Sequence, residues 1–537
     1  MREPFVPPPP APLPPPTPVT RNTWLASIAA FSAAWMVVMA TRYFALQAGD
    51  VNGGLGVGVD SGSWLSTVYS ICEPIGVVLG SWLGMVVSLR RMLLAGVALF
   101  LAGMCLPLVA PGYEALMVSR IVTGLAAGAI MPQCIVIQLQ AWGATRTPIA
   151  IALYLSAPTA AGHFGGLIGA WGVKRFGWTF VLWASAPLGV LSLVTAWMGC
   201  RRERYSWRPL VHADVAGFVS LCAALGLFAC AVSQGDRMRW FQTPVIPVLF
   251  VASAACLAIF VLREWGNIRH PALWVKLYGR WNIALTATGV LSLTLAISLS
   301  GVIVPSVLAQ VQGFRPEQVA PALWTAVWPQ ALSYALCVMI VRRKLCDIRV
   351  LIILGFATVA IGALLDLRLT SQWQAGELYL GQLIQGIGLP MIALPLIYQF
   401  TGDLRPPAES LPAASVFNLS RALGGTVATA WAGASLRLAS QAKFTELLGA
   451  TGSYPAGQGD ALASITGRMA HLTSDPRLAH AQAVQVVANA ARRQAAVLGA
   501  ASVLATLGWL LFASCILVVL MAEFGWGKAL RPHEKRP

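Results

Sequence analysis

The sequence predicts an all-α membrane protein with fourteen transmembrane helices, and two observations carry this prediction. First, 57% of the 537 residues are hydrophobic and only 11% are charged, with a mean hydropathy of +0.69, whereas a soluble domain carries about 25% charged residues. Second, apolar segments of about 20 residues, long enough to cross a hydrocarbon layer as helices, recur almost from end to end. The predicted spans are 24–48, 61–86, 91–110, 115–140, 147–172, 177–198, 211–233, 244–263, 282–309, 318–341, 349–368, 377–400, 411–434 and 496–522.

The two ends of the sequence, 1–23 and 523–537, are predicted to be cytoplasmic tails. The first reads "MREPFVPPPPAPLPPPTPVTR". A secretory signal has a basic start followed directly by an apolar run, so this proline-rich segment is predicted to be a disordered, polyproline-like tail. The second contains the basic stretch "GKALRPHEKRP".

Lys and Arg residues predict the orientation. Basic pairs such as Arg90–Arg91, Arg201–Arg202 and Arg342–Arg343 follow even-numbered spans, and basic loops stay on the cytoplasmic side. Both termini are therefore predicted to lie in the cytoplasm, with the chain crossing the inner (cytoplasmic) membrane many times. The net charge of +17 is then a topology signal, since a nucleic-acid interface needs a basic face on a soluble domain.

Motifs for a metal site or an enzyme active site are missing from the sequence. The ten cysteines occur singly rather than in C-x-x-C pairs, which indicates neither a metal nor a redox site. No H-E-x-x-H, G-x-S-x-G or Walker sequence is present, so we expect neither an enzyme nor a nucleotide-binding protein.

A degenerate repeat predicts two related halves. "RIVTG" at 120–124 is matched by "QLIQG" at 382–386, and "GGLIGAW" from Gly165 by "GGTVATAW" from Gly424, at similar separations. Homologous halves around a central path are a common plan of secondary transporters. The predicted organisation is a six-helix bundle (24–200), two inserted helices with basic loops (201–280) and a second six-helix bundle (281–522) with an external loop (435–495) that is helical at both ends.

Four stretches, in this order, resemble motifs of the major facilitator superfamily, specifically its fourteen-span drug:proton antiporters of the EmrB type. They are "SGSWLSTVYSICEPIGVVLGSWLG", "RIVTGLAAG", "GHFGGLIGAW" and "PPAESLPAASVFNLSRALGG". The resemblance implies a major facilitator fold with 14 transmembrane helices (6 + 2 + 6). It also implies proton-coupled export of hydrophobic or amphipathic small molecules, such as drugs and lipophilic or aromatic acids, by alternating access. The alternative is a proton-coupled importer of an organic anion. No cofactor other than the proton gradient is implied.

The sequence departs from this family at three places. The first span usually carries an aspartate, but "VVMATRYFALQ" (37–47) has no acid and contains Arg42. In the fifth span Gly162–His163 stands where the family has Gly-Pro. The loop after the second span lacks an acid, although Gly80, Gly84 and the basic pair at 90–91 persist.

Glu73 is the acid best placed to carry the proton. It lies near the middle of the second span and is followed by Pro74, and burial favours the protonated form of a carboxyl group. A coupling or substrate-binding role and an ion pair with Arg42 or Arg120 are both open, and the two are compatible.

Three other polar residues of the spans have open alternatives. Arg120 either snorkels to the outer interface or faces a central cavity, where it would tune the proton site. His163 is either protonated from outside or a packed neutral ring. Asp214 and Asp366 are expected to be interfacial acids at helix ends.

The predicted substrate cavity is cationic and aromatic. Its candidate residues are Arg42, Tyr43, Tyr69, Tyr154, Asn418 and Arg421, which favour an anionic or aromatic compound. The small residues Gly124, Gly128, Gly162, Gly165 and Gly166, with Gly80, Gly84, Arg90 and Arg91, are predicted to be structural. The resemblance also implies that the external loop contacts a periplasmic adaptor protein that leads to an outer-membrane channel.

Overall fold

The computed structural model describes residues 19–201, 214–266, 281–368, 370, 372–402, 409–452, 463–469 and 475–521. Across these residues the chain forms helices and turns, without a strand. The predicted proline-rich tail up to residue 18, the basic tail after residue 521 and the basic stretches 202–213 and 267–280 lie outside the described residues.

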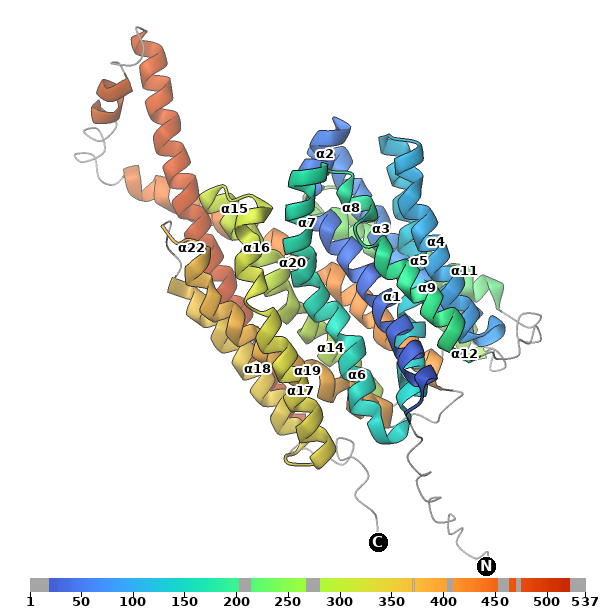
Figure 1. Cartoon of the computed structure of the whole chain (residues 1–537). Coiled ribbons are helices and arrows are strands. Elements are labelled where there is room, and N and C mark those ends of the chain that lie inside the picture. The colour runs from blue at the N-terminus through green and yellow to red at the C-terminus, as the bar shows by residue number, and fades with distance from the viewer. Residues whose placement is uncertain are drawn as a thin grey trace, which may run out of the picture.

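The N-terminal half contains the six predicted spans (Figure 1). They are α1 (Arg21–Leu46), α3 (Val59–Val87), α4 (Leu89–Val109), α5 (Tyr113–Trp142), α6 (Thr147–Ser156) with α7 (Gly162–Phe176), and α8 (Phe180–Trp183) with α9 (Ala186–Gly199); the short α2 (Ala48–Leu55) follows α1. The fifth span is interrupted by a π turn, η2 (Ala157–Ala161), which contains Pro158. Proline lacks the N–H that an α-helix needs and clashes with the preceding turn, so the helix widens there.

The C-terminal half has the same type of irregularity. Its first span is divided by a second π turn, η4 (Leu299–Ile303), just before Pro305. The helices are α14 (Trp281–Ser298), α15 (Val304–Gln312), α16 (Pro316–Trp324), α17 (Val327–Arg343), α18 (Ile348–Leu365), α19 (Tyr379–Gly402), α20 (Ser410–Gly452) and α22 (Pro476–Met521).

Thirteen of the fourteen predicted spans have helices long and apolar enough to cross a membrane, within the part of the chain that the structure describes. The remaining predicted span, 411–434, lies in α20, which packs against α3, α5 and α14 inside the bundle. Polar side chains such as Asn418 and Arg421 lower the hydropathy of this helix. The all-α membrane class is confirmed, and the number of spans is confirmed for thirteen.

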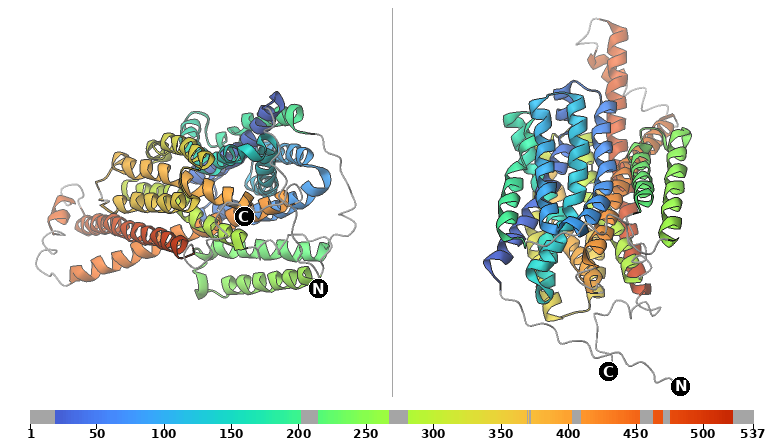
Figure 2. Two further views of the ribbon diagram at one scale, coloured as in Figure 1. Left: turned by 90° about the horizontal axis from the view of Figure 1, so that it is seen from below. Right: turned by 90° about the vertical axis from the view of Figure 1, so that its right-hand side faces the viewer.

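The inserted helices α11 (Val215–Gly235) and α12 (Val245–Gly266) form a pair at the edge of the bundle (Figure 2). α11 packs against α3 and α20, and α12 packs against α11. At the start of α11, Asp214 caps the helix through Gly217 and pairs with Arg263 of α12 at 2.9 Å. The Arg263 guanidinium holds the pKa of Asp214 below its usual value, so Asp214 is the helix-start acid that was predicted.

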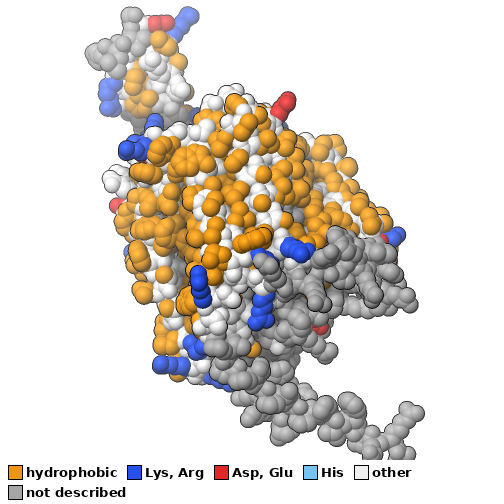
Figure 3. Space-filling model, turned by 45° about the vertical axis from the view of Figure 1, so that its right-hand side comes forward, with side chains coloured by type: hydrophobic (Ala, Val, Ile, Leu, Met, Phe, Trp, Pro, Cys, Tyr) orange, Lys and Arg blue, Asp and Glu red, His pale blue; other side chains and the backbone are white. Residues whose placement is uncertain are grey.

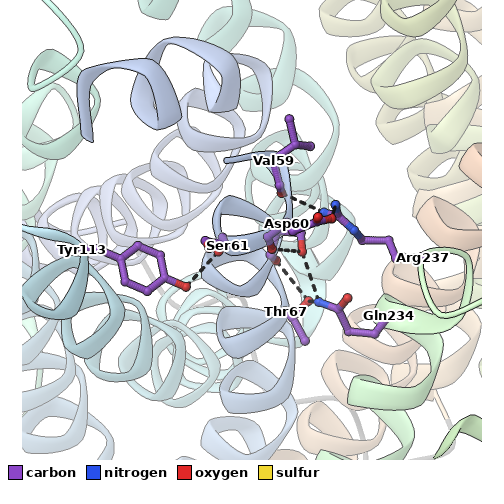
Figure 4. Close-up of polar contacts among 8 residues, drawn as sticks. Val59, Asp60, Ser61, Thr67, Tyr113, Gln234 and Arg237 are labelled. Carbon is purple, nitrogen blue, oxygen red and sulfur yellow. Dashed lines mark hydrogen bonds and ion pairs between the residues drawn. The ribbon is translucent and has the colours of Figure 1, made fainter. Parts of the chain in front are cut away.

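At the opposite end α11 contacts α3 (Figure 4). Arg237 forms an ion pair with Asp60 and donates a hydrogen bond to the Val59 carbonyl at 2.8 Å. Gln234, one turn earlier, donates to Thr67 Oγ1 at 2.7 Å. These contacts attach the inserted pair to the N-terminal half at its outer end.

The same end of α11 also contacts the C-terminal half. Arg437 of α20 donates two hydrogen bonds from Nε to the Asp236 carboxylate, at 2.9 and 3.0 Å. The inserted pair therefore bridges the two halves at the C-terminal end of α11.

α20 and α22 continue beyond the bundle as two helices that pack against each other (Figures 1 and 2). Both ends of the stretch 435–495 are thus helical, as predicted. Below this projection, hydrophobic side chains cover most of the face drawn in Figure 3, as expected of a surface in contact with lipid tails.

Candidate functional site

An ion pair joins the two halves midway along α3. Glu73 lies at the centre of α3, and its Oε1 accepts a hydrogen bond from Arg421 Nη2 of α20 at 2.8 Å. The two side chains are only 16% and 18% exposed. The predicted pairing of Glu73 with Arg42 or Arg120 is wrong, because α20 rather than α1 or α5 presents the nearest guanidinium.

Arg421 also belongs to a hydrogen-bonded network that makes a second contact between the two halves. Its Nε donates to Asn418 Oδ1 at 3.4 Å, and the same oxygen accepts a hydrogen bond from the Tyr154 hydroxyl of α6 at 2.6 Å. Asn418 and Tyr154 are buried. Four of the predicted site residues therefore form one network of Glu73, Arg421, Asn418 and Tyr154.

Arg120 lies in the interior, near the outer end of α5. Its guanidinium stacks over the rings of Phe44 and Tyr69, at 4.0 and 4.4 Å from their centres, and donates to the Leu65 carbonyl at 3.3 Å. Aromatic faces stabilise a cation where water is scarce. The structure thus places this side chain inside the protein, with 8% of its surface exposed, rather than at the lipid interface.

A small cavity lies beside Arg120. It is lined by side chains of α1, α3, α4, α5 and α8, including Thr41, Phe44, Tyr69 and Thr123. The Tyr69 hydroxyl and Thr41 Oγ1 are 2.9 Å apart. Tyr69, a predicted substrate residue, is thus in contact with Arg120 and is absent from the Glu73 network. The sequence offered no signal for Thr41.

Arg42 occupies a space that glycines leave open. A Cβ atom on Gly162 would lie 3.2 Å from Arg42 Nε, and one on Gly301 would lie 2.7 Å from Nη1. Arg42 donates to the Gly301 carbonyl, within the π turn η4 of the other half, at 3.4 Å. His163 follows Gly162 directly and is buried. Arg42 is therefore a third contact between the halves, and its partner Gly301 was missed by the sequence analysis.

Tyr43 is separated from the other predicted substrate residues. It is completely buried, and its ring packs against Gly169 of α7 and, at 6.3 Å between centroids, against Phe180. This position lies within the N-terminal half, so the structure brings Tyr43 to the packing between α1, α7 and α8.

Small residues bring α3 and α5 close together beside Glu73. A Cβ atom on Gly124 would lie 2.8 Å from Cys72 Cβ, and one on Gly128 would overlap the backbone carbonyl of Glu73. Gly80 and Gly84 continue this contact, against Ala129 and Gln133 respectively. In the fifth span Gly165 packs against Arg42, and Gly166 contacts Leu323 of the other half.

Arg90 anchors the inner end of α4. It donates to the Trp197 carbonyl at 2.7 Å and lies 4.8 Å from the centre of the Trp197 ring. The backbone N–H of Arg91 donates to the Ser88 side chain at the start of the same helix. Both contacts fix the turn between α3 and α4.

Asp366 differs from its prediction. The sequence analysis placed it at the interface beside Arg368, but its side chain is only 1% exposed and lies against Gly381 of α19. Its position at a helix end beside Arg368 is as predicted, but the carboxyl group is buried rather than exposed, because the glycine lets α19 approach closely enough to cover it.

Two helical halves that meet at buried polar contacts define the architecture of a secondary transporter with a central path. The chain matches the Major Facilitator Superfamily over residues 23–429, and it belongs to that family. It is therefore a multi-pass membrane transporter of small molecules rather than an enzyme.

Individual relatives agree with the predicted EmrB type. The chain is 25% identical over 424 residues to the multidrug export protein EmrB of Haemophilus influenzae, covering 75% of this chain and 79% of that one. It is 22% identical over 402 residues to the fatty acid resistance protein FarB of Neisseria gonorrhoeae, covering 74% and 77%. An autoinhibited peptide transporter of the POT family superposes with a TM-score of 0.54 at 14% identity, over 94% of this chain and 97% of that one, which shows a shared fold.

Proposed function

We infer that this chain is a proton-coupled secondary transporter that exports hydrophobic or amphipathic small molecules across the cytoplasmic membrane by alternating access. The observation that carries the proposal is the Glu73–Arg421 pair, a buried ion pair between the two halves whose carboxylate lies at the centre of α3. The relatives named as a multidrug exporter and a fatty acid resistance protein support it. Both termini would lie in the cytoplasm, by the positive-inside rule.

Coupling would operate through the conformation. The ionised form of Glu73 stabilises the arrangement in which α3 and α20 are adjacent, because only there does it meet Arg421. Protonation removes this attraction and so favours arrangements in which the two helices separate. Antiport follows if the substrate binds more tightly to the paired arrangement and the proton binds more tightly to the separated one. Binding of either then weakens binding of the other, because both act on the same conformational equilibrium.

The substrate class would be a lipophilic anion. Around the path, Arg42, Arg120 and Arg421 supply three guanidinium groups, whereas Glu73 supplies the carboxylate. Aromatic rings flank Arg120. An amphipathic acid matches both features, because its carboxylate can bind a guanidinium group while its apolar part packs on the aromatic rings. His163, buried next to the Arg42 site, would adjust the charge of that site.

An anion that binds Arg421 itself would behave differently. It would compete with ionised Glu73, so it would bind together with a proton and be carried in the same direction. This is the importer alternative. We favour export because Arg42 and Arg120 lie outside the Glu73–Arg421 pair and leave that pair intact.

The projecting ends of α20 and α22 would dock a periplasmic adaptor protein, and through it an outer-membrane channel. Exposed apolar side chains on the projection suit such a contact: Leu438 is 53% exposed, Val484 45% and Val487 41%. Their removal from water on docking would stabilise a complex.

The proposed function is tested with inside-out vesicles that contain the purified protein and a fluorescent lipophilic carboxylic acid. An imposed proton gradient, acidic in the lumen, should drive accumulation of the acid. Glu73→Gln should abolish this accumulation and leave substrate counterflow, which needs no net proton movement, largely intact. Glu114→Gln, a change at an exposed acid, is the matched control. Normal gradient-driven transport by Glu73→Gln would refute the role of Glu73, and gradient-driven loss of substrate from the vesicles would indicate import.

A further inference from the structure

A second buried polar cluster lies in the C-terminal half, where the end of α18 meets the start of α19. Asp366 opens the short turn η5 (Asp366–Arg368) and is 1% exposed. Gln382 and Gln385, both on the first turns of α19, are completely buried. None of these three side chains belongs to the Glu73 network.

Glycines bring the members of this cluster together. A Cβ atom on Gly381 would overlap the Asp366 carboxylate, and one on Gly362, a turn earlier in α18, would lie 3.2 Å from Gln385 Cγ. The same Cβ atom on Gly362 would lie 3.1 Å from the carbonyl oxygen of Gly381. The carboxyl group and the amide side chains therefore share one tightly packed helix crossing.

Five polar side-chain atoms of this cluster lack hydrogen-bond partners within the described structure. They are Asp366 Oδ2 and both amide atoms of Gln382 and of Gln385. Buried polar groups are almost always hydrogen-bonded, and leaving one unsatisfied destabilises the fold. Several such atoms at one crossing indicate a site that is not selected for stability alone.

No cation that the structure describes faces Asp366. α18 carries Arg349 at its opposite, cytoplasmic end, and Arg368, which follows Asp366 in η5, is exposed. α19 contains no charged residue, and on α22, which packs against η5, the described membrane stretch 494–521 contains none either. The basic residues Arg477, His480, Arg492 and Arg493 of α22 lie on its outer extension, and Glu377 before α19 is exposed. A charged carboxylate inside a membrane protein needs a partner, so a proton is what neutralises Asp366.

The internal repeat gives this site a counterpart. In the pairing of "RIVTG" with "QLIQG", Gln382 takes the place of Arg120 and Gln385 the place of Thr123. Each half thus carries a buried polar cluster at the outer end of the corresponding helix. The N-terminal half has a fixed positive charge there, and the C-terminal half has a carboxyl group.

We propose that Asp366 is a second proton-carrying residue of the transporter. Protonated Asp366 permits the close crossing of α18 and α19 seen here. Loss of the proton would leave a bare carboxylate against Gly381 and force the crossing to open, which exposes the amides of Gln382 and Gln385 to the outer side. The tight packing leaves space for a proton rather than for a hydrated metal ion. This inference rests on the proposed proton-coupled function, and it adds one proton to each transport cycle.

The decisive experiment measures how many protons move with each substrate molecule. Purified protein in liposomes, with the membrane potential clamped at zero, is tested for the substrate gradient that balances an imposed pH difference. At a difference of one pH unit, each coupled proton contributes a factor of about ten to that gradient. Asp366→Asn, which resembles the protonated acid, should therefore lower the limiting gradient about tenfold while transport remains coupled. Glu114→Gln should leave it unchanged. An unchanged gradient for Asp366→Asn would overturn the proposal.

Two further measurements keep the outcomes distinct. Infrared spectroscopy of the protein at neutral pH should detect the carbonyl stretch of a protonated carboxyl group in Glu73→Gln, and that band should be missing from the double variant with Asp366→Asn. This readout does not depend on transport, so it stands even if the proposed export fails. Persistence of the band in the double variant would refute Asp366 as its source. Replacement of all sodium by choline should change nothing, and a loss of transport would identify the site as a sodium site instead.

Discussion

Substitution of Arg421 by glutamine tests the ion pair at the centre of the proposed mechanism. The change removes the guanidinium that lies 2.8 Å from Glu73 Oε1 and leaves the carboxylate in place. Because the Glu73 side chain is only 16% exposed, water cannot fully replace the lost partner. Glutamine keeps much of the volume and some hydrogen bonding, so the variant isolates the effect of charge.

The expected loss of stability in Arg421→Gln follows from the geometry of the ion pair. Two opposite unit charges about 4 Å apart attract by about 4 kcal/mol at an effective dielectric of 20. Removal of one member of a buried pair costs about 3–5 kcal/mol, because the other charge is left uncompensated. Because both side chains are partly exposed, we expect Arg421→Gln to lower the free energy of unfolding by about 3 kcal/mol, the lower end of this range. The double variant Glu73→Gln/Arg421→Gln removes both charges and should be within about 1 kcal/mol of the natural protein.

Thermal unfolding of the purified protein, followed by tryptophan fluorescence in one detergent, measures this order of stability. The unfolding midpoint should fall by several degrees in Arg421→Gln and recover in the double variant. Lys443→Gln, which breaks an exposed pair with Glu446, is the control and should change stability by less than about 1 kcal/mol.

The reasoning fails in either of two cases. A double variant that is less stable than Arg421→Gln would mean that each side chain stabilises the fold by contacts of its own rather than through the other. An Arg421→Gln protein as stable as the natural one would mean that the pair contributes no net stability in this conformation.

Three further substitutions have definite expected outcomes. Arg120→Ala removes the cation stacked on two aromatic rings, so transport should be lost while the amount of protein inserted in the membrane, measured by immunoblot, stays normal. Gly128→Leu would place a side chain on the backbone of Glu73, and since helices cannot be this close with a large residue between them, folded protein should fail to accumulate in size-exclusion profiles. Asp236→Asn weakens the contact between the C-terminal end of α11 and Arg437. It should lower the free energy of unfolding by about 1 kcal/mol or less and speed the opening of that end of the bundle in a cysteine-accessibility assay.

The bundle and its helices follow from the sequence because lipid imposes a simple rule: an apolar stretch of sufficient length becomes a helix. The helix that this rule does not detect is α20, whose polar residues Asn418 and Arg421 lie in the hydrogen-bonded network between the two halves. Hydropathy is lowest where function needs polar groups, so a span with a site inside it is harder to detect than one that only faces lipid.

The partners of the charged residues could not be predicted in the same way. Glu73, Arg42 and Arg120 were each recognised as intramembrane charges, but which of them meet depends on how the two halves face each other. Arg421 lies more than 300 positions from Glu73 in the chain, as their separation of 348 shows, and no local pattern encodes that contact. Asp366 was misplaced for a related reason: its burial depends on Gly381 in the next helix, and a residue at the end of a span looks interfacial when only its own helix is considered.

Two of the three departures of this chain from the EmrB-type pattern, those in the first and fifth spans, meet in space. Arg42 stands in the span where the family carries an acid, and its side chain occupies the space left by Gly162, directly before the histidine that replaces the family's proline. The guanidinium then reaches the carbonyl of Gly301 in the other half. The first span therefore carries a cation where the family carries an acid. Under the proposals above, the acid chemistry falls to Glu73 and Asp366 instead, and Arg42 would attract an anionic substrate.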